Sequence, residues 1–211
     1  MFANRKDAGE KLAAALVRYK NKGVCVLAIP KGGIEVAKEA AKYLNADFSL
    51  IIVRKLPFPE EPEAGFGAVA EDGSLYLNPQ ANLYLSEDEI ERIIAEQTNE
   101  IKRRINLLRN GNPLIETEGR TVILIDDGIA AGSSMRAAIM MLRNKKAGKI
   151  IVASPVAGRE TVRIMEKLAD EVVVLETPEY FRAVAQVYEN WYDVSDEEAI
   201  ELLSKTKTKR N

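Results

Sequence analysis

The chain alternates between apolar segments of strand length and amphipathic segments of helical length, and this alternation limits the folds open to it. Apolar runs of strand length occur at residues 24–29, 48–53, 121–125, 149–153 and 172–175. Segments with helical periodicity separate most of them, at residues 34–44, 133–145 and 158–168. Strands that are apolar throughout and alternate with helices are typical of a parallel sheet covered on both faces. We therefore expect an α/β fold with a mainly parallel twisted sheet of about five strands and helices on both faces.

Two stretches of the chain interrupt the alternation. Residues 54–63 contain three prolines, so this segment is expected to form neither a central strand nor a helix interior. Shorter strand-like pieces follow at residues 67–70 and 74–77. The second interruption, residues 177–195, concentrates aromatic side chains.

Helices are also expected outside the alternating segments. Residues 86–109 form the clearest helical pattern, because Ser86 and Glu89 have the spacing of a capping box ahead of an apolar stripe. Residues 7–20 show a second amphipathic pattern. The last residues, 205–211, are expected to form a frayed tail.

The composition excludes several kinds of chemistry. The chain has no histidine, which removes Ser-His-Asp and Cys-His catalysis and histidine-ligated metal sites. Its single cysteine, Cys25, cannot form an intrachain disulfide or a thiolate metal cage, and its apolar neighbours indicate a buried structural thiol. The remaining functional groups are carboxylates, lysine, arginine, hydroxyls and backbone amides, and that set suits phosphate chemistry.

Charge and hydropathy limit the partners. Thirty basic and thirty-two acidic residues give a net charge of -2, so no domain-wide cationic field is expected to hold nucleic acid or an anionic membrane. The longest uncharged stretch, residues 73–86, contains Gly, Asn and Pro, and no segment is expected to span a bilayer. The first residues lack the apolar core of a signal peptide, so a cytoplasmic location is expected.

The strongest functional pattern is the segment VILIDDGIAAGSSM at residues 122–135. A buried strand delivers Asp126 and Asp127 at its carboxyl end, which is where open α/β sheets bind ligands. A loop of small residues then leads into a helix, whose free backbone N–H groups and the hydroxyls of Ser133 and Ser134 make an anion cradle of phosphate size. Two carboxylates beside a phosphate cradle suit a sugar phosphate.

This segment resembles the phosphoribosyl pyrophosphate (PRPP) signature of type I phosphoribosyltransferases, and the resemblance extends over most of the chain. Pro30-Lys31-Gly32-Gly33 lies where that family places its pyrophosphate loop. Arg54-Lys55 and the proline-rich continuation lie where the family has a flexible lid. Together with Arg5-Lys6-Asp7-Ala8-Gly9 and Val53-Arg54-Lys55-Leu56, these segments look like a branch of predicted phosphoribosyltransferases of unassigned base specificity.

The resemblance implies an enzyme of nucleotide metabolism that transfers the 5-phosphoribosyl group from PRPP to a nitrogen nucleophile, such as a nucleobase, and releases pyrophosphate. It implies that Asp126 and Asp127 hold the ribose hydroxyls. The residues implied for the 5'-phosphate are Ala130, Ala131, Gly132, Ser133 and Ser134. Those implied for pyrophosphate are Lys31, Gly32, Gly33, Arg54 and Lys55. The activity is expected to depend on Mg²⁺ held mainly by PRPP and water, with no dedicated metal site in the protein.

The same resemblance implies three structural features. A small C-terminal hood, at approximately residues 177–195 of a single domain spanning 1–211, is expected to hold the base. Its aromatic candidates are Tyr180, Phe181, Tyr188, Trp191 and Tyr192. A cis peptide that does not precede proline is expected in the loop at residues 30–33, and a homodimer is the family-level expectation.

Structural interpretations of the same residues stay open. The two aspartates could cap a helix or hold Mg²⁺ in another α/β protein, and the Lys31 loop could be a plain turn from strand to helix. Arg54 and Lys55 could be solvated charges at the end of a strand, and the aromatic residues could simply pack in the core. The motif Gly65-Phe66-Gly67-Ala68-Val69-Ala70 matches a dinucleotide-binding pattern, but it opens no expected helix, which argues against such a site.

Two other functions also stay open. One is a non-catalytic PRPP sensor that controls a partner, and the other is a metal-dependent phosphohydrolase. The acceptor is unassigned, because Ala130 stands where the hypoxanthine-guanine branch of the family has an aspartate that assists the purine.

Overall fold

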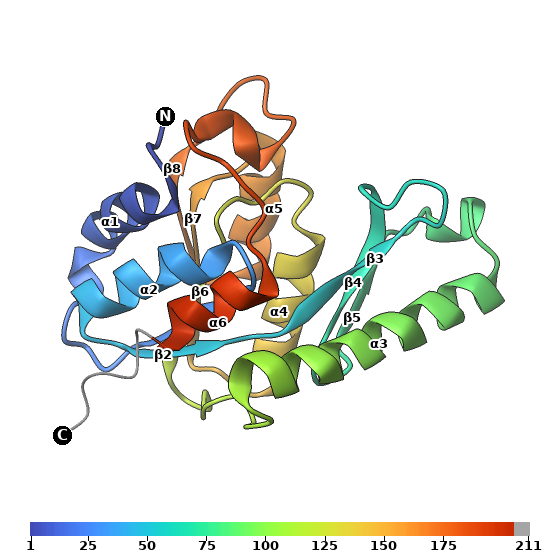
Figure 1. Cartoon of the computed structure of the whole chain (residues 1–211), viewed down its shortest axis with the longest axis horizontal. Helices are drawn as coiled ribbons and strands as arrows, with labels where there is room; N and C mark the ends of the chain where they lie inside the picture. Colours follow the sequence, from blue (N-terminus) through green and yellow to red (C-terminus); the bar gives the residue numbers. More distant parts are fainter. Residues whose placement is uncertain (205–211) are drawn as a thin grey trace.

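Five parallel strands form the central sheet of the computed structural model, which describes residues 1–204 (Figure 1). The strands lie in the order β2-β1-β6-β7-β8. Their bounds are β1 (Cys25–Ala28), β2 (Asp47–Leu50), β6 (Thr121–Ile125), β7 (Lys149–Val156) and β8 (Glu171–Glu176). The expected α/β fold with a five-stranded parallel sheet is confirmed. The tail expected at residues 205–211 lies outside the described residues.

The two faces of this sheet are covered by different helices, because successive side chains of a strand point to opposite faces. Val26, Ile123 and Ile151 belong to the core shared with α1 (Arg5–Ala15) and α2 (Gly33–Leu44). The alternate residues, including Leu27, Leu124 and Val152, pack on the other face with α4 (Ser133–Asn144) and α5 (Arg159–Leu168). Burial on both faces explains why these strands are apolar at every position.

The helix expected over residues 7–20 is shorter than its sequence pattern. It begins at Arg5, because the side chain of Asn4 accepts a hydrogen bond from the backbone N–H of Asp7. It ends at Ala15 and continues as the 3-10 turn η1 (Val17–Tyr19), in which the N–H of Tyr19 donates to the carbonyl of Leu16.

An arm of three antiparallel strands projects from the sheet (Figure 1). It consists of β3 (Val53–Pro57), β4 (Gly65–Ala70) and β5 (Leu75–Leu77), followed by the turn η2 (Ala81–Leu83). The single strand expected at residues 48–53 is thus divided between two sheets. The N–H of Ile51 still donates to the carbonyl of Ala28 in the central sheet, whereas Val53 begins β3 and pairs with β4 in the arm. Gly65 and Gly67 lie inside β4, so the dinucleotide pattern opens no helix, as expected.

The long helix α3 (Glu87–Arg109) supports the arm, because it packs against β3 and β4. The capping box predicted from the sequence is present between Ser86 and Glu89. At the other end, the guanidinium of Arg109 pairs with Glu71, with 2.6 Å between Nη2 and Oε2, and donates to the carbonyl of Leu50. The helix is therefore fixed to both the arm and the central sheet.

The first residues of the chain pair with a late segment that precedes the last described helix. We refer to residues 177–195, which contain the turn η3 (Val184–Val187), as the hood. The N–H of Phe2 donates to Val187 at 2.7 Å, and the N–H of Glu189 donates to Phe2 at 2.9 Å. The last helix, α6 (Asp196–Ser204), follows the hood and packs against α2 and α3 (Figure 1). None of the helices within residues 1–204 is long and apolar enough to cross a membrane.

Candidate active site

The site is built where β1 and β6 end side by side. Ala28 pairs with Ile125, and the N–H of Ile29 donates to Ile125 at 2.9 Å. The helices that follow these two strands, α2 and α4, pack on opposite faces of the sheet. Such a point in a parallel sheet leaves a crevice beyond the strand ends. The loop at residues 30–33 and the aspartates after β6 therefore border the same crevice.

The contact between the loop and the aspartates is very close. A Cβ atom placed on Gly32 would lie 1.9 Å from Oδ2 of Asp127, and one on Gly33 would lie 2.9 Å from the carbonyl of Ile125. Only glycine fits at the first of these positions without moving the carboxylate. The peptide bond between Pro30 and Lys31 is cis, as the resemblance implied.

The two aspartates line different hollows. Asp126 lines one of about 440 Å³ together with residues 128–135, which include every residue expected at the 5'-phosphate. Asp127 lines another of about 470 Å³ together with Lys31, Gly32 and Trp191. The acids therefore stand between a small-residue loop on one side and the Lys31 loop on the other.

The small-residue loop has the geometry of an anion site. Gly132 has φ +77, and the helix α4 begins at the next residue, so the first N–H groups of this helix have no partner within it. The hydroxyl of Thr161 donates to the carbonyl of Ala130 at 2.6 Å, and the N–H of Ile129 donates to Val156 at 2.9 Å. These bonds hold the loop from behind and leave the helix start facing the hollow.

The aspartates also differ in their electrostatic surroundings. Asp127 is buried, and its Oδ2 accepts from Nε of Arg5 at 2.8 Å. Asp126 has no such ion pair among the described residues; its Oδ1 accepts from the N–H of Asp127 at 2.9 Å. Burial, followed by the negative charge of Asp127, raises the pKa of Asp126 well above its usual value. The pair can thus offer one anchored carboxylate and one carboxyl group that readily holds a proton.

The residues expected to bind pyrophosphate are not all brought together. Lys31 and Gly32 line the hollow beside Asp127, whereas Lys55 lines the hollow beside Asp126. Nζ of Lys55 donates to the carbonyl of Glu63 at 2.6 Å within the arm. Arg54 also points elsewhere, since its Nε donates to Gln97 of α3 at 2.9 Å.

The aromatic residues of the hood separate into distinct groups. Of the five named from the sequence, Trp191 lines the hollow beside Asp127. Tyr188 is buried beside Trp191, with 5.2 Å between the ring centres, and its hydroxyl donates to the carbonyl of Asp127 at 2.7 Å. Burial and the charge of Asp127 raise the pKa of Tyr188. Tyr180 and Tyr192 are exposed, and Phe181 approaches Gly158.

Comparison with known proteins settles the family. The model of the phosphoribosyl transferase domain family matches residues 2–190. The chain belongs to this family. Two Mycobacterium tuberculosis proteins, named as candidate phosphoribosyl transferases, are 38% identical over 207 residues, which is 97% of this chain and 47% of theirs. The chain therefore spans about half the length of these curated relatives.

Solved structures with the same fold include two bacterial proteins. The phosphoribosyl transferase domain described here is 37% identical to the protein TT1426 of Thermus thermophilus, with a TM-score of 0.80, over 97% of this chain and 98% of that one. It shares its fold with AQ2163 of Aquifex aeolicus, which is 14% identical, with a TM-score of 0.54 over 84% of this chain and 76% of that one.

Arg5 is the site residue that the sequence analysis missed. In this phosphoribosyl transferase domain its side chain is 3% exposed, its Nη1 donates to the carbonyl of Tyr192 at 2.8 Å, and its guanidinium carbon lies 4.1 Å from the centre of the Trp191 ring. The sequence did contain a signal that Arg5 is buried, because residues 5, 8, 9 and 12 have helical spacing, and all four are buried in the structure. A charged residue on the apolar face of a helix requires a buried partner.

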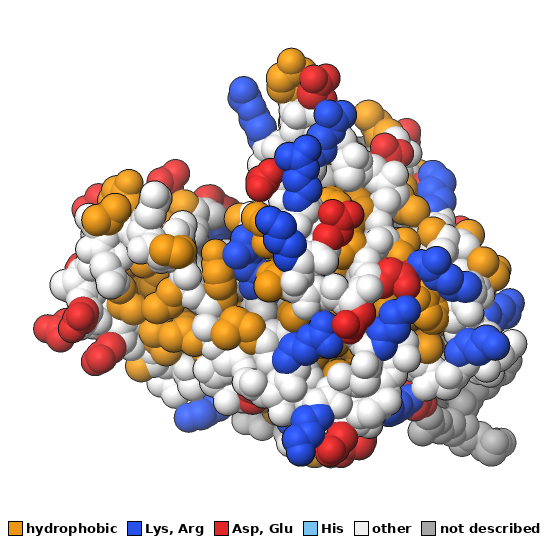
Figure 2. Space-filling view, turned by 180° about the vertical axis from the view of Figure 1, so that it is seen from behind, with side chains coloured by type: hydrophobic (Ala, Val, Ile, Leu, Met, Phe, Trp, Pro, Cys, Tyr) orange, Lys and Arg blue, Asp and Glu red, His pale blue; other side chains and the backbone are white. Residues whose placement is uncertain are grey.

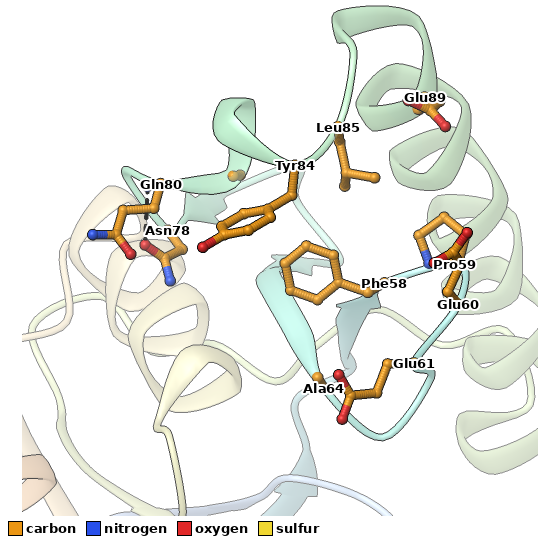
Figure 3. A pocket seen from close by; sticks show the side chains of 11 residues that line it. Phe58, Pro59, Glu60, Glu61, Ala64, Asn78, Gln80, Tyr84, Leu85 and Glu89 are labelled. Carbon is orange, nitrogen blue, oxygen red and sulfur yellow. Dashed lines mark hydrogen bonds between the residues drawn. The ribbon is translucent and has the colours of Figure 1, made fainter.

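A further hollow, of about 530 Å³, lies on the arm, and neither aspartate lines it (Figure 3). The rings of Phe58 and Tyr84, with centroids 6.1 Å apart, form part of its wall, and Glu61 and Glu89 stand at its rim. Figure 2 shows apolar side chains gathered on the arm, while basic and acidic side chains are interspersed over the rest of that face. No residue predicted for the site lines this hollow, so we give it no part in the chemistry.

Proposed function

We propose that this domain transfers the 5-phosphoribosyl group of PRPP to a nitrogen nucleophile and releases pyrophosphate. The observation that carries the proposal is the position of Asp126 and Asp127 between the small-residue loop at 128–135 and the loop of Lys31. PRPP has a phosphate at one end of its ribose and a diphosphate at the other, with two hydroxyls between them. The order of groups in the crevice matches that order in the substrate.

Each part of the crevice has a role in this reaction. The N–H groups and hydroxyls of residues 130–134 bind the 5'-phosphate, and the aspartates bind the ribose hydroxyls. The bond from C1 to the diphosphate oxygen breaks, a bond from C1 to the acceptor nitrogen forms, and the nearby carboxylate of Asp127 stabilises the positive charge that develops on the ring. Lys31, Gly32 and Gly33 bind the diphosphate as it leaves with the bonding electron pair.

A nucleobase is the acceptor class that we propose. The acceptor and the leaving group must both reach C1, and Trp191 lines the same hollow as Lys31. An indole ring offers a flat surface on which a base can lie. Arg5 fixes this ring by covering one of its faces, so the ring is pre-positioned before the acceptor binds.

The chemistry of the donor set fits Mg²⁺ bound mostly by the substrate. Asp127 already pairs with Arg5, and Asp126 has a raised pKa, so neither is well placed to serve as a principal ligand of a bare cation. Mg²⁺ readily keeps waters and phosphate oxygens in its coordination shell. When bound, it would neutralise the charge of the diphosphate, while Lys31 and the loop amides orient that group. A cytoplasmic location and a homodimer stay predictions from the sequence.

Calorimetric titration of PRPP, with and without Mg²⁺, tests the proposal. We expect saturable binding by the wild type and much weaker binding by Asp126→Asn/Asp127→Asn. The matched control is Glu87→Gln/Asp88→Asn, which removes two adjacent charges from the exposed start of α3 and should bind as the wild type does. A folded wild type that does not bind PRPP would contradict the proposal.

A screen of nucleobases for pyrophosphate release then separates the remaining functions. Release that depends on one base supports the transferase. PRPP binding without turnover by any base would instead indicate a non-catalytic sensor. Phosphate release that needs no acceptor would indicate a phosphohydrolase.

A further inference from the structure

Lys31 is held by a carboxylate from the last helix of the described chain. Its Nζ lies 3.4 Å from Oδ1 of Asp196, the first residue of α6. The other oxygen of this carboxylate, Oδ2, accepts from Nη2 of Arg103 on α3 at 3.0 Å. A single carboxylate thus joins the loop after β1 to a helix of the arm, and Figure 1 shows α6 lying beside both α2 and α3.

Further cationic side chains lie near this carboxylate. Glu100 accepts from Arg103 at 2.7 Å and from Arg104 at 2.9 Å. Hydrogen bonds from these two arginines lower the pKa of Glu100 to about 2, against the opposing effect of burial. Arg54 lies within the same electrostatic neighbourhood: burial, and then repulsion from Arg104, lower its pKa. Four cationic side chains therefore share two carboxylates.

Asp196 is not needed to start its own helix. The N–H of Ser195 donates to Oε2 of Glu198 at 2.8 Å, and the N–H of Glu198 donates to the hydroxyl of Ser195 at 3.1 Å, so a capping box is complete without it. Val194 and Ala199 are buried and anchor the helix start to the core. The carboxylate of Asp196 can therefore lose its partners while α6 stays in place.

We propose that Asp196 is an internal stand-in for the diphosphate group, and that a diphosphate ligand displaces it from Lys31 and Arg103. The inference rests on the function proposed above and extends its pyrophosphate site to a residue of α3. The positive charges of Arg104 and Arg103 act on Arg54, and this concentration of positive charge favours a second negative charge beside Arg103.

The geometry makes this exchange selective for a diphosphate. The two oxygens of Asp196 hold two cations from different elements, 3.4 Å and 3.0 Å away. A ligand with two linked anionic groups can replace both contacts at once and brings more charge than one carboxylate. A single phosphate can replace only one of the two contacts, so it leaves Asp196 on the other cation and benefits less from the removal of this carboxylate.

The test is calorimetric titration of inorganic pyrophosphate, and of inorganic phosphate, into variants of the whole chain. Asp196→Asn removes the competing charge, so we expect its Kd for pyrophosphate to fall about 2- to 5-fold, the effect of one partly exposed ion pair. The matched control, Glu197→Gln, removes one charge from the same helix turn at an exposed position and should leave the Kd unchanged.

Arg103→Gln should have the opposite effect and raise the Kd for pyrophosphate by a similar factor. Its control is Arg92→Gln, which breaks an exposed pair with Glu96 on the same helix and should change little. If Asp196 merely orients Lys31, Asp196→Asn will weaken pyrophosphate binding or leave it unchanged, and either result overturns the inference. If Asp196→Asn raises the affinities for phosphate and pyrophosphate equally, the proposed selectivity for a diphosphate is also overturned.

Two further measurements separate this inference from the proposed function. Lys31→Gln should weaken pyrophosphate binding whether or not Asp196 competes with the ligand. If the wild type binds neither PRPP nor pyrophosphate, the proposed function itself fails. Should Asp196→Asn melt well below the wild type, Asp196→Ser removes the same charge with a smaller side chain and is judged by the same direction of change in Kd.

Discussion

At the scale of single residues, the two adjacent aspartates have acquired unequal roles from their neighbours. Arg5 reaches Asp127 from helix α1 and fixes it as an ion pair, with side chains that are 3% and 11% exposed. Asp126 receives no comparable cation among the described residues and lies beside a buried negative charge. Two carboxyl groups in contact rarely ionise together in a buried site, so the one without a cation holds its proton to higher pH.

This difference predicts how stability depends on pH. Because the pKa of Asp126 is raised above its usual 3.8, the folded state binds more protons than the unfolded state between these two values. The contribution of Asp126 to the free energy of unfolding should therefore be full below about pH 3.8 and fall as pH rises through the folded pKa. Urea unfolding of the wild type and of Asp126→Asn between pH 4 and 8 measures this contribution.

The expected result is that Asp126→Asn gains stability relative to the wild type as pH rises over this range. Comparing the two proteins at each pH cancels the other titrating groups, including Glu35 and Glu71, whose pKa values burial also raises. A difference that stays constant would show that Asp126 ionises as freely as in the unfolded chain, and a change in the opposite direction would show that folding lowers its pKa.

Sequence reasoning reached some of these residues and not others for a physical reason. Asp126, Asp127 and Lys31 follow strands directly, and the carboxyl ends of parallel strands meet at one edge. The partnership between Arg5 and Asp127 spans 122 positions, so no local spacing reveals it. Lys55 lies inside β3, a strand of the arm and not of the central sheet, and its side chain lines the hollow beside Asp126 instead.

At the scale of elements, the start of α2 is packed against the end of β6 with no space to spare. We predict that Gly32→Ala will be destabilised by about 1–3 kcal/mol and will lose PRPP affinity, because its methyl group must displace the carboxylate of Asp127. The control is Gly158→Ala at the start of α5, where φ is -66 and the nearest atom to an added Cβ is 3.5 Å away. Urea unfolding and PRPP titration compare them, and equal behaviour of the two variants would refute the close contact.

Elements whose ends are set locally were predicted well. Helix α3 begins where its capping box places it and ends at Arg109, because the next residue, Asn110, has a positive φ of 52. The extent predicted for the strand at residues 48–53 was wrong. Ile51 and Ile52 are fully buried, so the apolar run continues through the point where the chain passes from the central sheet to the arm. An apolar run indicates that its residues are buried, but it does not indicate which strand they pair with.

At the scale of the whole molecule, the hood is held in place by the first residues of the chain. Phe2 is 2% exposed, and its ring centre lies 5.6 Å from that of Tyr188, which in turn supports Asp127. We predict that Phe2→Ala costs about 3–5 kcal/mol. Hydrogen exchange should show the largest loss of protection at the N–H groups of Glu189 and Asn190, which donate to residues 2 and 3. A loss spread evenly over β6 and β7 would mean that the N-terminal residues do not specifically hold the hood.

The pairing of β1 with β6 also has a consequence for how the chain is made. Cys25 lies opposite Val122, so the ribosome must add nearly a hundred residues, including the whole arm, before the central pair can close. At ordinary rates of synthesis this takes about 5–20 s. During that interval one edge of β1 has no partner, and closing so long a loop favours slow assembly. The crevice between these strands can form only after translation has passed residue 125, so nascent chains stalled before that point should depend on chaperones and bind no sugar phosphate.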